Sequence, residues 1–196
     1  MKIAIIGAGI SAITIAKNLK SIANVSLFEK SSGVGGRMAT RLSSPYDFDH
    51  GAQFFTAKSV NFKNFIEPLI KKGIIQQWDA RFSEFKNNKI LRNITWDSEF
   101  PHYVGVPGMN SISKYLSKDL DVKLEAKVNK IIKNSTNSWQ LLDDNKNDLG
   151  RFDWVVSTAP AVQSAEILPK FFKYHSDLLN IKMVGCFSLM LGFKKA

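Results

Sequence analysis

The chain has 196 residues, of which 44% are hydrophobic and 22% charged, and its formal net charge is +10. These proportions predict a globular protein with a buried core, and they exclude a disordered or fibrous chain. A single cysteine, Cys186, excludes a disulfide framework and a cysteine-based metal site. Because the lysines are scattered along the chain, the basic charge predicts a solvated surface and no nucleic-acid partner.

Residues 1–15 imitate a signal peptide, since a lysine is followed by apolar residues. Gly7 and Gly9 interrupt this apolar run, and no A-x-A cleavage pattern follows. The chain contains no stretch of about eighteen apolar residues. We therefore expect no signal peptide, no membrane span and a cytoplasmic location.

The first thirty residues predict a strand, a tight turn, a helix and a second strand. Lys2–Ile6 is a short isoleucine-rich run followed by glycine, as in a buried parallel strand. Residues 11–21 carry apolar side chains at helical spacing, and residues 25–29 form the next strand-like run. Strand, helix and strand in this order indicate a βαβ unit of an α/β fold.

The remainder of the chain predicts short strands and helices. In chain order we expect a helix at residues 61–72, a hairpin of strands at 81–85 and 90–96, and a helix at 109–116. Four strands at 122–124, 128–133, 139–142 and 154–157 and a helix at 161–168 follow. The last run, 185–193, is apolar on both faces and predicts a strand covered from both sides. Such a strand needs partners, so we expect the sequence to stop in mid-domain.

The turn after the first strand reads Gly7-Ala-Gly-Ile-Ser-Ala12 and matches the pattern G-x-G-x-x-G/A. In this pattern the glycines let the backbone turn tightly and approach a pyrophosphate, which binds at the helix N-terminus. Glu29 ends the second strand about 20 residues later, where an acidic side chain accepts hydrogen bonds from ribose hydroxyls. The turn, its flanking elements and the acid together predict a dinucleotide-binding site.

A second glycine-rich segment, Ser32-Gly-Val-Gly-Gly-Arg-Met-Ala-Thr40, follows almost at once. Its adjacent glycines allow another close backbone approach, and Arg37 supplies a cation with forked donors for phosphate. A nicotinamide-dependent dehydrogenase has no standard need of this second segment. The two motifs together resemble the amine-oxidase-type FAD superfamily, so FAD is the cofactor that we expect.

Three further segments, 48–57, 103–110 and 152–160, resemble the renalase-like branch of that superfamily. The resemblance implies an α/β fold in which a three-layer, Rossmann-like FAD/NAD(P)-binding domain is interleaved with an incomplete mixed-sheet substrate domain. Residues 1–56 and 104–165 are expected to form the FAD-binding domain. Residues 57–103 and 166–196 are expected to belong to the substrate domain, whose second segment is truncated.

The resemblance also implies an activity and a set of binding residues. The flavin is expected to oxidise a small molecule, either a reduced or isomeric NAD(P)H-type dinucleotide or an amine, and O2 is expected to reoxidise it with release of H2O2. The cofactor-binding residues that the resemblance implies are Gly7, Gly9, Ser11, Ala12, Glu29, Lys30, Gly36, Arg37, Met38, His50, Gly51, Ala52, Gln53 and Val128. Of these, residues 50–53 are expected at the isoalloxazine, and the backbone of Val128 at the adenine.

The sequence singles out no catalytic side chain. His50, His102 and His175 lack metal-ligand spacing, so we expect no metal site. In flavoenzymes the cofactor carries the redox chemistry, and the protein binds and orients the reactants. Trp78, Trp96 and Tyr103 either line a substrate cavity or belong to the core. The rival hypothesis is a truncated, non-catalytic dinucleotide-binding fragment.

Overall fold

The computed structural model describes residues 1–96, 99, 101–135 and 137–194, and the chain divides into two compact units. The first unit comprises Met1–Arg37 and Leu116–Leu189, and the second comprises Met38–Tyr115 and Met190–Ala196. The chain therefore leaves the first unit within the second glycine segment, after Arg37, and returns to it at Leu116. The expected boundaries were after residues 56, 103 and 165, whereas the units change after residues 37, 115 and 189. The assignment of the parts to an FAD domain and a substrate domain stays a prediction.

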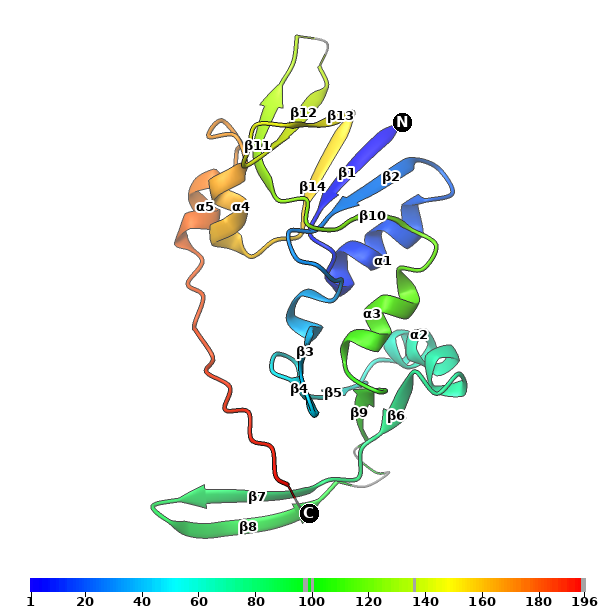
Figure 1. Cartoon of the computed structure of the whole chain (residues 1–196), viewed down its shortest axis with the longest axis vertical. Coiled ribbons are helices and arrows are strands. Elements are labelled where there is room, and N and C mark those ends of the chain that lie inside the picture. The colour runs from blue at the N-terminus through cyan, green and yellow to red at the C-terminus, as the bar shows by residue number, and fades with distance from the viewer. Residues whose placement is uncertain (97–98, 100, 136, 195–196) are drawn as a thin grey trace. The chain divides into compact units, whose positions relative to one another are not determined.

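A four-stranded parallel sheet forms the centre of the first unit (Figure 1). Its strands stand in the order β10-β2-β1-β14, with bounds Asp121–Lys123, Asn24–Phe28, Lys2–Ile6 and Trp154–Ser157. β1 lies between two neighbours and is buried from Ile3 to Ile6, which explains its unbroken apolar sequence. Helix α1 (Ile10–Leu19) packs against β1 and β2 and buries Ala12, Ile13 and Ala16.

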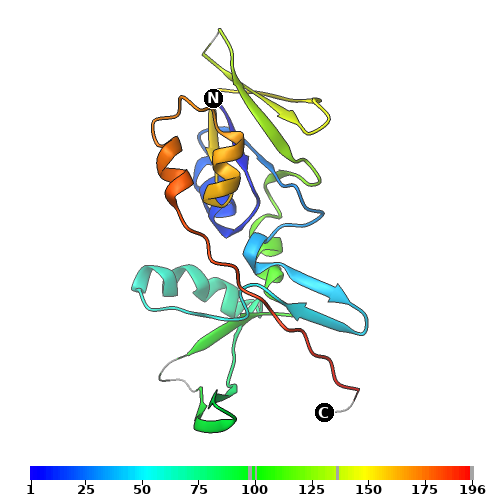
Figure 2. The same cartoon turned by 90° about the vertical axis from the view of Figure 1, so that its left-hand side faces the viewer.

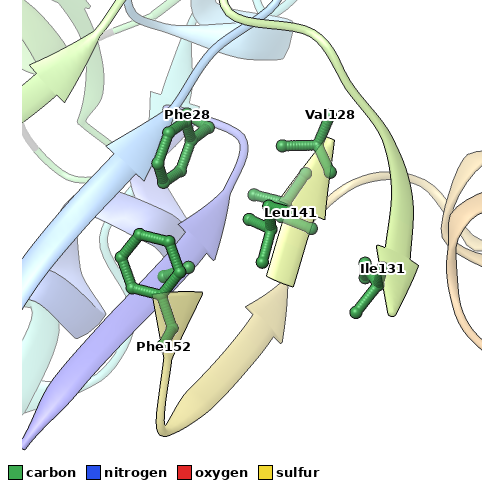
Figure 3. Close-up of a cluster of buried hydrophobic side chains, with 7 residues drawn as sticks. Phe28, Val128, Ile131, Leu141 and Phe152 are labelled. Carbon is green, nitrogen blue, oxygen red and sulfur yellow. The ribbon is translucent and has the colours of Figure 1, made fainter. Parts of the chain in front are cut away.

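An antiparallel sheet adds a further layer to the first unit, and its strands β11, β12 and β13 span Val128–Lys133, Trp139–Asp143 and Asp148–Phe152. A buried cluster joins it to the parallel sheet (Figure 3). In this cluster the rings of Phe28 and Phe152 meet edge to face, 5.6 Å between centroids, and Leu141 is fully buried. Ala4 and Ile6 of β1 also belong to the cluster. Alternate β1 residues face the other side of the sheet, so α1, the parallel sheet and the antiparallel sheet make three layers.

Two short helices follow β14. Helix α4 (Ala161–Ile167) packs against β11, and α5 (His175–Asn180) packs against α4. A ring nitrogen of His175 lies 3.0 Å from the carbonyl oxygen of Ala165 and is hydrogen-bonded to it. The fold of the first unit is thus the Rossmann-like α/β arrangement predicted from the sequence.

The strand expected at residues 185–193 is not formed, so that prediction is wrong. Residues 181–193 run as an extended segment without helix or strand (Figure 2). The side chains of Val184, Phe187 and Leu189 are 92%, 102% and 82% exposed. A strand is defined by its hydrogen-bonded neighbour, and no strand of the described residues pairs with this segment. Apolar sequence alone therefore did not decide its structure.

The described residues of the second unit form two hairpins, a small sheet and two helices. The hairpins are β3–β4 and β7–β8, with bounds Thr40–Ser43, Tyr46–Asp49, Arg81–Lys86 and Lys89–Thr95. The sheet has the order β5-β9-β6, with bounds Phe55–Thr56, His102–Gly105 and Ile75–Gln77. Helix α2 (Val60–Lys71) packs against β6, and α3 (Asn110–Leu116) follows β9 (Figure 1). A 3-10 turn, η1 (Gly36–Met38), precedes β3.

Candidate dinucleotide-binding site

The turn after β1 has a conformation that requires glycine. Gly7 has a φ of +101°, and its N–H donates to the carbonyl of Phe28 at 2.8 Å. A Cβ atom on Gly7 would lie 2.7 Å from Oγ1 of Thr158, which follows β14 and donates to the carbonyl of Ile6 at 2.9 Å. The backbone conformation and the lack of space both exclude a side chain at this position.

The two glycine segments touch backbone to backbone at the start of α1. Gly9 forms a parallel bridge with Gly35, whose N–H donates to the carbonyl of Ala8 at 2.9 Å. Gly36 has a φ of +55°, and a Cβ atom on it would lie 3.3 Å from Cα of Gly9. Gly9 is also the N-cap of α1 and offers no side chain to its first N–H groups. Such a bare, glycine-lined helix start is typical of a phosphate-binding site.

Glu29 is only 7% exposed, and its carboxylate is hydrogen-bonded to the backbone through both oxygens. Oε2 accepts from the N–H of Ala8 at 2.8 Å, and Oε1 accepts from the N–H of Ser31 at 2.9 Å. These bonds tie the end of β2 to the glycine turn and fix the orientation of the carboxylate. Because each carboxylate oxygen has about two acceptor sites, each retains one for a ribose hydroxyl.

The chain returns to the same corner after the second unit. The N–H of Glu29 donates to the carbonyl of Lys123 at 2.9 Å, and the N–H of Ala126 donates to the carbonyl of Glu29 at 2.9 Å. This return places Val128, the first residue of β11, in the same buried cluster as Phe28 at the end of β2 (Figure 3). The backbone at the start of β11 is therefore held close to the end of β2.

The structure brings together at this corner the predicted residues that belong to the first unit, and the other predicted residues belong to the second unit. The residues of the first unit lie in the glycine turn, in the second glycine segment, at the end of β2 and at the start of β11, and they are Gly7, Gly9, Ser11, Ala12, Glu29, Lys30, Gly36, Arg37 and Val128. Those of the second unit are Met38, His50, Gly51, Ala52 and Gln53. Their expected place beside the isoalloxazine, like each cofactor contact, stays a prediction.

Two residues at this corner stand outside the set of predicted cofactor-binding residues. Thr158 fills the space beside Gly7, and Gly35 is buried and makes the backbone bridge to Gly9. Gly35 had a visible signal, since it is the first glycine of the adjacent pair in the second motif. Thr158 had a weaker one, because it directly follows an apolar strand.

An aromatic cluster lies in the second unit. The rings of Trp96 and His102 stack with centroids 3.8 Å apart and planes 5° apart, and Phe54 contacts both rings. Trp78 packs against Trp96 at 5.5 Å, edge to face. Phe54 and Trp78 are 38% and 42% exposed, so the cluster is neither a closed core nor a fully open surface. Its role in holding a substrate stays a prediction.

In the part of the chain that the structure describes, each helix is too short or too polar to cross a lipid bilayer. Within the same residues, no three histidine, cysteine or acidic side chains come together in a way that would hold a metal ion.

The residues at this corner fit the diphosphate and ribose of a dinucleotide. Side chains are excluded at Gly7, the backbone approach at Gly9 and Gly36 is close, and the fixed acceptor Glu29 stands beside both. The fold and the site thus define a dinucleotide-binding protein of the Rossmann-like type. They do not distinguish a flavin from a nicotinamide dinucleotide.

Comparison with known families makes that distinction. Residues 5–69 match the model of an NAD(P)-binding Rossmann-like domain, and residues 76–196 match the model of flavin-containing amine oxidoreductases. The second match spans more than half of the chain, so the chain belongs to the flavin-containing amine oxidoreductase family. FAD is accordingly the cofactor indicated for its dinucleotide site.

A solved structure shows the same fold. It is the crystal structure of a protein from Exiguobacterium sp. 255-15, assigned provisionally as a protoporphyrinogen oxidase, and it matches with a TM-score of 0.66 at 12% sequence identity. The match covers 86% of this chain and 61% of that one, so the present chain spans less than two thirds of its length. At this identity the likeness concerns the fold alone.

Proposed function

We propose that this chain provides the FAD-binding part of a renalase-like oxidoreductase. Its substrate would be a reduced or isomeric NAD(P)H-type dinucleotide, which gives up a hydride, with an amine as the next candidate. O2 would be the final electron acceptor and H2O2 the product. The family match supports the flavin, and the renalase-like segments at 48–57, 103–110 and 152–160 support the finer assignment.

The observation that carries the dinucleotide-binding part of this proposal is the buried, doubly hydrogen-bonded carboxylate of Glu29 beside two glycine segments in backbone contact. A buried carboxylate is costly unless its acceptor sites are used. Here two backbone N–H groups use part of that capacity, and the remaining acceptor sites suit the paired hydroxyls of a ribose. A nucleotide with a 2′-phosphate in that position would place two negative groups together, so FAD fits better than an NADP-type cofactor.

The protein's own residues would bind and orient the cofactor. When bound, FAD supplies a two-electron acceptor at its isoalloxazine, so no acidic or basic side chain has to carry the redox step. The glycine segments would hold the diphosphate against the start of α1, and Arg37, which follows the adjacent glycines of the second segment and is exposed, would offer a cation to it. His50 to Gln53 would form the surface that the isoalloxazine contacts.

The test begins with the cofactor. Purified protein, loaded with FAD if it lacks any, should show a flavin absorption spectrum and release FAD on denaturation. Under anaerobic conditions, reduced or isomeric nicotinamide dinucleotides should bleach the flavin band faster than amines, and air should restore it with release of H2O2. Protein that binds NAD tightly and ignores FAD would refute the proposal. FAD binding without bleaching by any of these substrates would instead favour a non-catalytic dinucleotide-binding chain.

A further inference from the structure

Asp49, the last residue of β4, is hydrogen-bonded to the start of α3. Oδ1 of Asp49 accepts from Oγ1 of Thr40 at 2.5 Å and from the N–H of Met109 at 3.0 Å, and Oδ2 lies 3.1 Å from the same N–H. Thr40 Oγ1 in turn accepts from the N–H of Asn110 at 3.3 Å. The end of the β3–β4 hairpin thus supplies the acceptors that the first N–H groups of α3 need.

Two glycines allow this close approach. A Cβ atom on Gly108 would lie 2.8 Å from Oγ1 of Thr40 and 3.4 Å from Oδ1 of Asp49. A Cβ atom on Gly105 would lie 2.6 Å from the carbonyl oxygen of Gly108. A side chain at Gly108 would push the hairpin away from the turn before α3, and a side chain at Gly105 would distort that turn. The Asp49 contact therefore depends on backbone packing as well as on its hydrogen bonds.

The segment that follows Asp49 is fixed at its other end as well. Phe55 and Thr56 form β5 and pair with β9, and the ring of Phe55 stacks on that of Tyr103 at 5.7 Å. β9 and the start of α3 belong to one continuous stretch, residues 102–110. Residues 50–54 are therefore a short bridge whose two ends are tied to the same stretch of chain.

We propose that Asp49 is a positioning residue, which holds the segment His50–Gln53 in place for the flavin. This inference rests on the proposed function, which assigns that segment to the isoalloxazine. Without the carboxylate, the N–H of Met109 loses its acceptor, and the bridge is held at that end only by the pairing of β4 with β3. A more loosely held bridge must be ordered again when FAD binds, and that ordering lowers the affinity.

The test compares Asp49→Ala with Asp49→Asn, which keeps one carbonyl acceptor, and with Asp47→Ala as the control. Asp47 lies in the same hairpin and is exposed. In the protein without FAD, hydrogen exchange of residues 50–54 should speed up in Asp49→Ala, while β1 and β2 stay unchanged. FAD titration should show about tenfold weaker binding for Asp49→Ala and a loss of about threefold or less for Asp49→Asn. Asp47→Ala should bind as wild type does.

A double-mutant cycle with Gln53→Ala separates positioning from general stability. If Asp49 acts through the bridge, its removal should cost much less FAD affinity once the Gln53 side chain is gone. Additive losses, or unchanged FAD affinity in Asp49→Ala despite faster exchange, would overturn the positioning role alone. Wild-type protein that binds no FAD would overturn the proposed function and this inference together. Should Asp49→Ala fail to fold, Asp49→Asn and Thr40→Val carry the same comparison, with a measurable loss of FAD affinity expected for Thr40→Val.

Discussion

Replacing Glu29 by glutamine tests the corner of the site directly. The change keeps the size of the side chain but turns one acceptor oxygen into an NH2 group. That group would face the N–H of Ala8 or of Ser31, at a place where the carboxylate oxygens now lie 2.8 and 2.9 Å from these donors. Losing one charged hydrogen bond and leaving a buried N–H unsatisfied should destabilise the first unit by about 2–4 kcal/mol.

Native-state hydrogen exchange of the β1 and β2 amides measures this loss where it occurs. Glu166→Gln is the matched control, because Glu166 is exposed on α4 of the same unit. Glu29→Gln should also weaken FAD binding, since the ribose loses an acceptor. A loss of stability below about 0.5 kcal/mol with unchanged FAD affinity would refute the role given to the buried carboxylate.

Three further changes test other parts of the structure. Gly7→Ala should destabilise the first unit by at least about 1–3 kcal/mol in hydrogen exchange, because its φ is positive and its Cβ would clash. Arg37→Ala should weaken FAD binding about tenfold to a hundredfold in titration, and Arg41→Ala far less; equal losses would mean that only general charge matters. In urea unfolding, Leu141→Ala should cost about 2–5 kcal/mol, and exposed Leu42→Ala almost nothing.

Sequence reasoning succeeded where local chemistry decides the structure. Helices α1 and α2 have their own apolar periodicity, and the β7–β8 hairpin has a two-residue turn in which Asn87 and Asn88 both take positive φ. Sequence reasoning failed where the pairing between strands decides the structure. β5 is only two residues long and is a strand because Phe55 and Thr56 meet Tyr103 and His102. The prediction for residues 185–193 failed in the opposite way, because this run has the composition of a strand but no strand of the described residues pairs with it.

The same division holds at the site. The glycine turn and Glu29 are close together in sequence, so their pattern predicts their geometry. Thr158 reaches Gly7 from the far end of the chain, and only the pairing of β14 with β1 puts it there. The hydrogen bonds of Asp49 to the start of α3 likewise depend on tertiary packing. Sequence motifs therefore predict which residues form such a site. The residues that hold them in place depend on tertiary packing, including long-range strand pairing.

The strand order β10-β2-β1-β14 has a consequence for how the protein folds during synthesis. The two inner strands and α1 emerge first, but the outer strands, which pair Ser26 with Asp121 and Ile3 with Trp154, emerge only after residues 38–115. Until then β1 and β2 have apolar edges without neighbours, and such edges are prone to aggregation. Contacts between residues so distant in sequence also slow folding. The nascent N-terminal half should therefore depend on chaperones until about Ser157 has left the ribosome.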